Sequence, residues 1–275
     1  MSSTLAGQLK SSKIYDLEQM RFPGMPLHPA HRPGYFYALY RRHRDSYRPT
    51  ENGPRSSASG VLTMMEHSGT HIDALCHQSC DLTLFGGVSV DRAETFTGFK
   101  ELGVETVPPI LGRGVLLDVA GCLGVAELPP GYAVSDRELS ACAVAQKVNV
   151  QAGDVLLVRT GYGARWDDEA CYLKAAGVGK SGTLWAAERS VIAVGADNVA
   201  WDALEERDPE TGSTLFAHVH LLTRKGIYIL ENLNLESLAR DRCYVFAFIG
   251  IPLKFRGATG SPIRPLALLE HPVAD

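Results

Sequence analysis

Short apolar runs bounded by Gly, Asp and Pro recur along the chain and dominate its hydrophobic pattern. Runs of this length that are rich in Val, Ile and aromatic residues are typical of buried strands. In chain order they are GVLTMMEHSGT, RGVLLDVAG, DVLLVRTGYG, SVIAVGADNVA, GIYILENL and RCYVFAFIGIPL. Two segments between them, SDRELSACAVAQ and SGTLWAAERS, are predicted as helices. The pattern therefore predicts a mixed α/β fold.

The N-terminal part of the chain departs from this pattern. We expect residues 1–13 to form a flexible tail and residues 14–275 to form a single domain, because the sequence shows no repeats and no long low-complexity segment. Residues 21–45 are rich in Pro, Gly, aromatic residues and Arg, and prolines break regular structure. We expect a long loop that covers a site, with a short helix around Tyr37 to Arg44.

Composition narrows the classes of partner. The 275 residues carry a net charge of −4 with mixed signs, which offers no basic stripe for nucleic acid. The longest apolar run, CYVFAFIGIPL, is too short to span a bilayer, and the N-terminus lacks the apolar core of a signal peptide. We therefore expect a cytoplasmic protein that acts on a small molecule, with neither nucleic acid nor membrane as a partner.

The six cysteines are scattered and form no CxxC pair, so a disulfide scaffold is not expected. Cys76 and Cys80 alone have a suggestive spacing. A metal or redox pair is one interpretation, and we favour the other, in which both are small apolar residues packed near a cluster of histidines.

That cluster is EHSGTHIDALCH, residues 66–77. On a strand, His67, His71 and Asp73 would share one face, while Gly69 permits a turn that re-aims side chains. Two imidazoles and a carboxylate suit Zn²⁺ or Mn²⁺, with water completing the coordination shell. His77 is either a fourth ligand or a free base beside the metal. The alternative is a set of polar residues on a solvated strand.

A second segment, AHVHLLTRKGIYILENL, adds candidate ligands. Glu231 interrupts an apolar run, and a carboxylate there must be paired, bound to a metal or at a strand end, because burying it alone costs several kcal/mol. His218 and His220 are further candidates, although a single histidine is more often a structural group than a ligand.

The segment HSGTHIDALCH resembles the HxGTHxDxPxH signature of the cyclase family of metal-dependent hydrolases, which includes kynurenine formamidases and isatin hydrolases. The resemblance extends from about Ile14 to Leu268 and includes VLLVRTGY, VGADNVA, HVHLLTRKGIYILENLNLESLA and IPLKFRGATGSPIRPLAL. It implies a swivelling β/β/α fold with a mixed, barrel-like sheet. It also implies assembly as a homodimer or homotetramer, in which the N-terminal loop of one subunit caps the site of its neighbour.

Carried over residue by residue, the resemblance implies that His67, His71 and Asp73 bind the metal and that His77 is the acid–base group. In members with two metal ions, Asp73 would bridge them, and His218 and Glu231 would complete the second site.

Three departures from the family pattern bear on this assignment. The stretch between His218 and Glu231 is one residue longer than in the formamidases, Leu75 replaces the usual proline, and His28 stands where formamidases carry a substrate-contacting tryptophan. We expect one tightly held ion with Glu231 nearby. A second ion requires the extra residue to be absorbed as a bulge.

The predicted function is hydrolysis of a C–N bond in a cyclic amide or an aryl formamide by metal-activated water, with His77 transferring the proton. We assign substrate contacts to His28, Phe22 and Tyr35, with core packing as the alternative for the two aromatic residues. The rival functions are lactone hydrolysis and metal binding without catalysis. The sequence has no GxSxG motif of the kind that carries a serine nucleophile.

Overall fold

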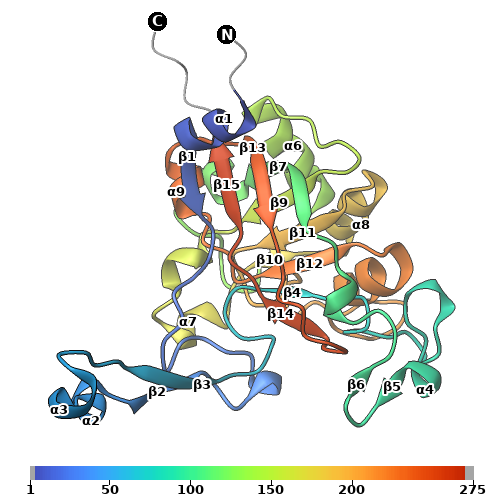
Figure 1. The fold of residues 1–275 in the computed structure, drawn as a ribbon. Helices are drawn as coiled ribbons and strands as arrows, with labels where there is room; N and C mark the ends of the chain where they lie inside the picture. Colours follow the sequence, from blue (N-terminus) through green and yellow to red (C-terminus); the bar gives the residue numbers. More distant parts are fainter. Residues whose placement is uncertain (1–3, 270–275) are drawn as a thin grey trace, which may run out of the picture.

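The computed structural model describes residues 4–269, and nine strands of this part form one mixed sheet that curls into a half-barrel (Figure 1). They are β1 (Lys13–Asp16), β4 (His71–Asp73), β7 (Ile110–Asp118), β9 (Val155–Arg159), β11 (Ala193–Ala196), β12 (Tyr228–Glu231), β13 (Val245–Gly250), β14 (Gly260–Pro262) and β15 (Leu266–Leu269). The order across the sheet is β1-β15-β13-β7-β9-β11-β12-β4-β14. The central strands from β7 to β12 are parallel, and the pairs outside them are antiparallel. The predicted α/β class with a mixed, barrel-like sheet is confirmed.

Both faces of the central strands are buried, which explains why their sequences are continuous apolar runs. Alternate residues enter two separate cores: Val115 and Leu156 face one, whereas Leu116 and Leu157 face the other. The first core also contains Leu139 from one of the helices that cover the sheet. Burial of the apolar runs therefore fixes the central sheet. Polar residues at the ends of its strands are available to form a site.

Helices connect and cover the strands. They are α1 (Leu5–Ser11), α2 (His43–Ser46), α3 (Pro49–Asn52), α4 (Val90–Ala93), α5 (Val119–Cys122), α6 (Asp136–Gln146), α7 (Glu169–Tyr172), α8 (Lys180–Glu188) and α9 (Glu236–Arg240). The two helices predicted from the sequence are confirmed as α6 and α8. Helix α6 begins with a capping box between Ser135 and Glu138 and ends at Lys147, which has a left-handed backbone.

The N-terminal region differs from its prediction. Residues 5–11 of the expected tail form α1, and residues 1–3 lie outside the described part. The helix expected around Tyr37 to Arg44 is wrong, because β2 (Phe36–Arg41) pairs with β3 (Ser59–Thr63), and only α2 follows. The aromatic residues of β2 favour a strand because β3 is there to pair with it. Helices α2 (His43–Ser46) and α3 (Pro49–Asn52) separate the two strands in the sequence.

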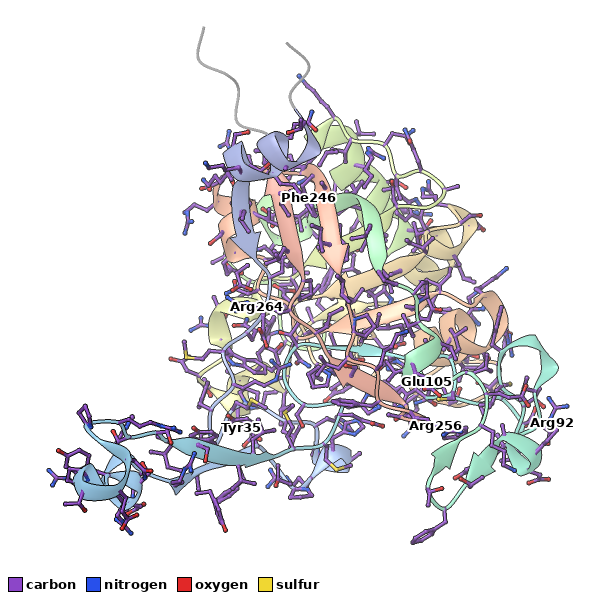
Figure 2. The ribbon with its side chains drawn as sticks, in the orientation of Figure 1. Tyr35, Arg92, Glu105, Phe246, Arg256 and Arg264 are labelled. Carbon is purple, nitrogen blue, oxygen red and sulfur yellow. The ribbon has the colours of Figure 1, made fainter. Side chains whose placement is uncertain are left out.

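Strands β2 and β3 with helices α2 and α3, residues 36–63, form a projecting arm that lies at the lower left of Figure 1. Tyr35, labelled in Figure 2, lies at its base, and the side chains of the arm stand apart from the body of the protein. Among the strands of residues 4–269, these two pair only with each other. An isolated two-stranded ribbon is only marginally stable in water, so we expect a further contact to stabilise the arm.

The remaining strands are short. They are β5 (Glu94–Thr95), β6 (Gly98–Phe99), β8 (Ala133–Val134) and β10 (Gly177–Val178). Short 3₁₀ turns are η1 (Pro29–His31), η2 (Phe85–Gly87), η3 (Val104–Thr106) and η4 (Tyr162–Arg165), and η5 (His218–Lys225) is a π-helix. No helix within residues 4–269 combines the length and the apolar character that crossing a bilayer requires.

Candidate metal centre

Strand β4 places the ligand candidates at the end of the sheet where chain segments distant in sequence meet. It lies between β12 and β14, with His71 opposite Glu231 and Asp73 opposite Gly260. Ile72 between them is fully buried in a core, so His71 and Asp73 share the other face of the strand. The alternation of a strand therefore presents two candidate ligands together.

Gly69 and Gly260 make room for the rings of the two histidines on either side of the turn before β4. Gly69 has a φ of +64°, and its carbonyl oxygen lies 2.8 Å from His71 Nδ1, which donates to it. At Gly260 a Cβ would lie 2.6 Å from His67 Cε1, so β14 passes close to the His67 ring only because residue 260 has no side chain. Local backbone geometry thus fixes the orientation of both rings.

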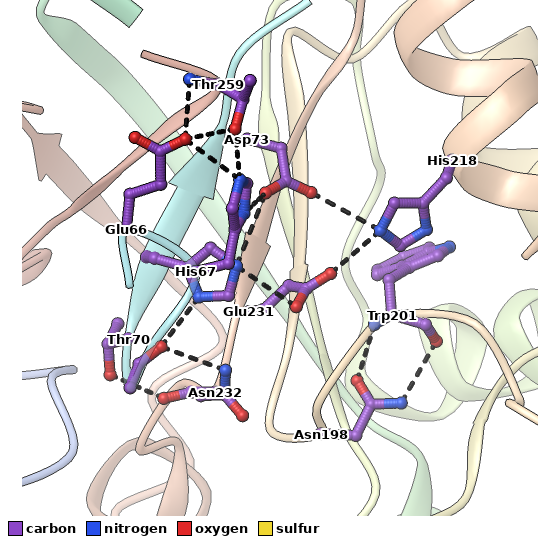
Figure 3. A network of polar contacts seen from close by, with 12 residues as sticks. Glu66, His67, Thr70, Asp73, Asn198, Trp201, His218, Glu231, Asn232 and Thr259 are labelled. Carbon is purple, nitrogen blue, oxygen red and sulfur yellow. Dashed lines mark hydrogen bonds and ion pairs between the residues drawn. The ribbon is translucent and has the colours of Figure 1, made fainter. Parts of the chain in front are cut away.

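Figure 3 shows His67, Asp73 and Glu231 pointing toward one another, and His71 forms a candidate ligand group with Asp73 and Glu231. His67 Nδ1 lies 2.8 Å from Asp73 Oδ1, and His71 Nε2 lies 3.4 Å from Asp73 Oδ1 and 3.3 Å from Glu231 Oε2. Two ligands bound at about 2.0–2.2 Å to one ion are themselves about 3 Å apart, so these separations suit a shared cation.

His218 joins the same cluster from the π-helix η5. Its Nε2 lies 3.1 Å from Glu231 Oε1 and 3.5 Å from Asp73 Oδ2, and its Nδ1 lies 2.8 Å from Asp202 Oδ2. A π-helix winds i to i+5 and so takes up an extra residue. The wider turn lies between His218 and Glu231, and both side chains still reach Asp73 or one another.

The donor set fits a divalent cation. Both carboxylate oxygens of Asp73 and Nδ1 of His67 are buried, and within the described part of the chain none of them has a hydrogen-bond partner. His67 Nε2 lies 2.7 Å from Thr259 Oγ1, which donates in turn to Glu66. If Nε2 carries the proton, His67 Nδ1 has an unprotonated lone pair that faces the Asp73 carboxylate. Two electron-rich groups this close repel each other unless a cation lies between them.

The electrostatics of the cluster also favour added positive charge. Burial raises the pKa of Asp73, but His77 and the other nearby histidines outweigh it and hold that pKa well below its usual value. Burial and the Asp73 charge raise the pKa of Glu231. The pKa of His218 is raised well above its usual value, because Asp202, Asp73 and Glu231 together outweigh its burial. Three carboxylates thus share a small volume and attract protons or a metal ion.

His77 lies beside the cluster, partly exposed. Its ring stacks on that of His67 with centroids 4.0 Å apart, and one of its nitrogens is close enough to His67 and Asp73 to share an ion with them. Burial lowers the pKa of His77 well below its usual value, and Asp73 only partly offsets this. A neutral imidazole in this position can be a ligand or a proton acceptor.

A cavity of about 160 Å³ opens onto these residues. Its lining includes His28, as predicted for a substrate contact, and residues that the sequence analysis missed, which are Ala30, His31, Gln78, Val199, Ala200, Leu204 and Leu215. Phe22 and Tyr35 pack against the first core and are not among the lining residues, which matches the core-packing alternative. The placement of His28 and His31 together shows that the N-terminal loop does reach the site.

Three other candidates lie outside the cluster. His220 stacks on Phe216 with centroids 5.3 Å apart and is not among the residues lining the cavity. Cys76 is buried in the second core, and Cys80 is partly buried. Neither cysteine belongs to a ligand group found among the described residues, in keeping with the packing interpretation.

The fold and this cluster define an α/β protein with a buried His/Asp/Glu cluster that could hold a metal ion. The chain belongs to the cyclase family: the family model described as "Putative cyclase" matches residues 15–203.

Curated relatives agree with this membership. The kynurenine formamidase of Bacillus thuringiensis (strain Al Hakam) is 27% identical over 208 residues, which are 74% of this chain and 77% of that protein. The kynurenine formamidase of Bacillus anthracis is 26% identical over 259 residues, which are 93% of this chain and 97% of that protein.

Solved structures share the fold. A crystal structure described as a novel cyclase matches with a TM-score of 0.83 and 29% identity, covering 95% of this chain and 90% of that one. An isatin hydrolase bound to the product analogue thioisatinate matches with a TM-score of 0.71 and 22% identity, covering 95% and 94%.

Proposed function

We propose that the protein is a metal-dependent hydrolase that cleaves the C–N bond of an aryl formamide or a cyclic amide. The observation that carries the proposal is the buried Asp73 carboxylate, which has no hydrogen-bond partner in the described chain and is ringed by His67, His71 and His218. Relatives named for formamide and isatin hydrolysis support the same reaction class.

The cofactor that suits these ligands is Mn²⁺ or Zn²⁺. His67, His71 and Asp73 would hold it, and His218 and Glu231 would hold a second ion across Asp73. When bound, such an ion lowers the pKa of water and polarises a carbonyl group. Asp202 and the Gly69 carbonyl hold His218 and His71 through their second ring nitrogens and so fix which nitrogen faces the centre.

His77 is the group that moves the proton. Its lowered pKa keeps the imidazole neutral, so it can accept a proton from the attacking water and deliver it to the departing nitrogen. The cavity lining also includes the apolar side chains of Val199, Ala200, Leu204 and Leu215. No Lys or Arg is among the described lining residues, which favours an uncharged substrate over one with a free carboxylate.

Lactone hydrolysis is the second candidate, since the same groups serve an ester bond. The third, metal binding without catalysis, leaves the cavity and the neutral His77 without a role.

The test uses the purified protein, its chelated form and the form reloaded with Mn²⁺ or Zn²⁺. Each is assayed with formanilide, isatin and a set of lactones, and metal content is measured by elemental analysis. Hydrolysis of an amide that is lost with the metal and regained on reloading supports the proposal. Hydrolysis of lactones alone would reverse the order of the two candidates, and bound metal without any turnover would favour the third.

We also propose that the arm contacts a second copy of the chain in a homodimer or homotetramer. Its exposed large apolar side chains are between 47% and 85% exposed, and they are Phe36, Tyr37, Leu39, Tyr40, Tyr47, Val61 and Leu62. Exposure on this scale marks an interaction surface. In Leu39→Glu/Leu62→Glu, light scattering should report a smaller assembly than the wild type, and an unchanged mass would exclude this contact.

A further inference from the structure

Cys122 and Cys142 bring two sulfur atoms together outside the metal cluster. Their Sγ atoms lie 2.8 Å apart, although the two residues are 20 positions apart in the chain. Both are free thiols, and neither lines the cavity or belongs to a candidate ligand group among the described residues. Within residues 4–269, no other two cysteines form such a contact. The pair therefore has no part in the hydrolysis proposed above.

The fold explains why these two cysteines meet. Helix α5 follows directly on β7, and its first turn is capped by Asp118, which accepts a hydrogen bond from the Gly121 N–H at 3.0 Å. Asp118 also pairs with Arg159 of the neighbouring strand β9 at 2.8 Å. Helix α6 packs against both β7 and α5. Cys122 thus ends a short helix that is anchored to the sheet, and Cys142 faces it from the middle of α6.

The two thiols differ in their surroundings. Cys122 is exposed, whereas Cys142 is buried in the first core and its Sγ donates a hydrogen bond to Gln146 Oε1 at 3.2 Å. That bond directs the Cys142 proton away from Cys122 and leaves a sulfur lone pair facing it. Burial also raises the pKa of Cys142, so this thiol does not react first with a solute. A small oxidant therefore meets Cys122 first, with Cys142 directly behind it.

The contact between the sulfur atoms is close to bonding distance. A disulfide S–S bond is about 2.05 Å long, so the two Sγ atoms have to approach by about 0.8 Å. Rotation of the exposed Cys122 side chain, or a small shift of the four-residue helix that carries it, supplies this approach. Helix α6 and the core beneath it can stay in place.

We propose that Cys122 and Cys142 are a peroxide-sensitive thiol pair that closes reversibly to a disulfide. First, the Cys122 sulfur attacks one oxygen of hydrogen peroxide, the O–O bond breaks, and Cys122 becomes a sulfenic acid while one water leaves. Next, Cys142 Sγ attacks that sulfur, the S–O bond breaks, and the departing hydroxide takes the Cys142 proton as a second water. Two thiols are oxidised, one peroxide is reduced, and a thiol reductant restores both cysteines.

The disulfide joins α5 to α6 across residues 123–141. A cross-link over a loop of this length constrains the unfolded chain and so stabilises the folded protein. For a chain of this size we expect Tm to rise by roughly 5–10 °C. Oxidation thus strengthens this part of the fold, whatever reaction the metal centre performs.

Peptide mapping tests the proposal directly. Trypsin separates the two cysteines, because Cys122 lies in residues 114–137 and Cys142 in residues 138–147. The purified protein is treated with an equimolar amount of hydrogen peroxide, digested without reductant and analysed by mass spectrometry, with thiols counted in parallel. We expect two of the six thiols to disappear, the two peptides to be joined, and dithiothreitol to reverse the joining and the rise in Tm.

Three variants complete the experiment. Cys142→Ala should stop the reaction at the first step, so that dimedone labels Cys122 and Tm does not rise. Cys122→Ala, a change at an exposed position, should leave Cys142 unoxidised. Cys171→Ala is the matched control, because Cys171 is partly buried and makes no contact with another sulfur within residues 4–269, and it should behave like the wild type.

Four results in the wild type would overturn the proposal. They are thiols that resist a ten-fold excess of peroxide, Cys122 oxidised without joining Cys142, residues 114–137 joined to a different cysteine peptide, and a joined pair that leaves Tm unchanged or lower. The mapping needs no variant, so it decides the linkage even if Cys142→Ala does not fold. It needs no substrate either, so its outcome is independent of the proposed function.

Discussion

Asp202 Oδ2 lies 2.8 Å from His218 Nδ1, and the other nitrogen of the same ring faces Glu231. Asp202 Oδ1 accepts a second hydrogen bond, from the backbone N–H of Ala217 at 2.7 Å, which holds the carboxylate against the start of η5. His218 is therefore oriented by a carboxylate that is itself immobilised.

Replacing Asp202 by Asn should weaken metal binding without removing a ligand. The amide cannot stabilise the His218 ring as a carboxylate does, and such changes cost about 10- to 100-fold in metal affinity. Asp208→Asn is the matched control, because Asp208 is also buried on the loop before η5 but pairs with Lys180. Competition with a fluorescent chelator measures both, and equal affinities in the two variants would remove Asp202 from the metal centre.

Gly260→Ala should displace His67. The new Cβ would lie 2.6 Å from His67 Cε1 and 2.9 Å from the Ile72 carbonyl oxygen, and neither can be accommodated without a shift. We expect metal content and activity to fall together. At Gly112, in the same sheet, the nearest atom to an added Cβ is 3.9 Å away, so Gly112→Ala should behave like the wild type. A Gly260→Ala protein with full metal content would show that the strand can move aside.

The variant His77→Ala tests whether His77 acts as a general base or as a metal ligand. If His77 only transfers protons, the variant keeps its metal and loses roughly 100- to 10,000-fold in turnover. Elemental analysis alongside the assay decides the question. Metal loss in this variant would instead place His77 in the coordination shell, as its distance to Asp73 and His67 allows.

The number of ions follows from His218. Because His218 Nε2 faces Asp73 Oδ2 while His67 and His71 face Oδ1, we now expect two ions that share the carboxylate. Calorimetric titration of the apoprotein with Mn²⁺ or Zn²⁺ should give two equivalents for the wild type and one for His218→Ala. A single equivalent in both proteins would restore the expectation of one ion.

Metal removal should loosen the end of the sheet around β4. The proposed ligands come from residues 67–73, from η5 and from β12, so a bound ion would join segments that otherwise meet through short ladders. Hydrogen exchange should accelerate in these segments after chelation, while the long β7–β13 pair stays protected. Uniform acceleration across the sheet would indicate global destabilisation instead.

The sequence predicts those parts of the fold whose pattern is local. The central strands are readable because burial on both faces demands continuous apolar runs. The prediction of a buried strand over GVLTMMEHSGT is wrong, because residues 60–63 belong to the exposed strand β3 and residues 64–70 form no strand. The arm was misread, since the strand propensity of its aromatic residues takes effect only through pairing with β3, which is not evident from residues 37–44 alone.

The missed site residues lack a local signal for a similar reason. His31 and Asp202 are brought to the cluster by the N-terminal turn and by the loop before η5, and neither stands in a recognisable spacing with the ligands. His31 follows His28 by three residues in HPAH, and Asp202 follows a buried strand, which are the only cues the sequence offers. Tertiary packing alone reveals their neighbours.

The contact between His67 and Thr259 joins residues 192 positions apart in the chain. Strand β14, which carries Gly260 beside Asp73, leaves the ribosome long after residues 67–73 do. A nascent chain that exposes HSGTHID therefore presents loose histidines long before it presents a site. Loading of the proposed metal ion would therefore follow the synthesis of β14 rather than accompany that of the histidines.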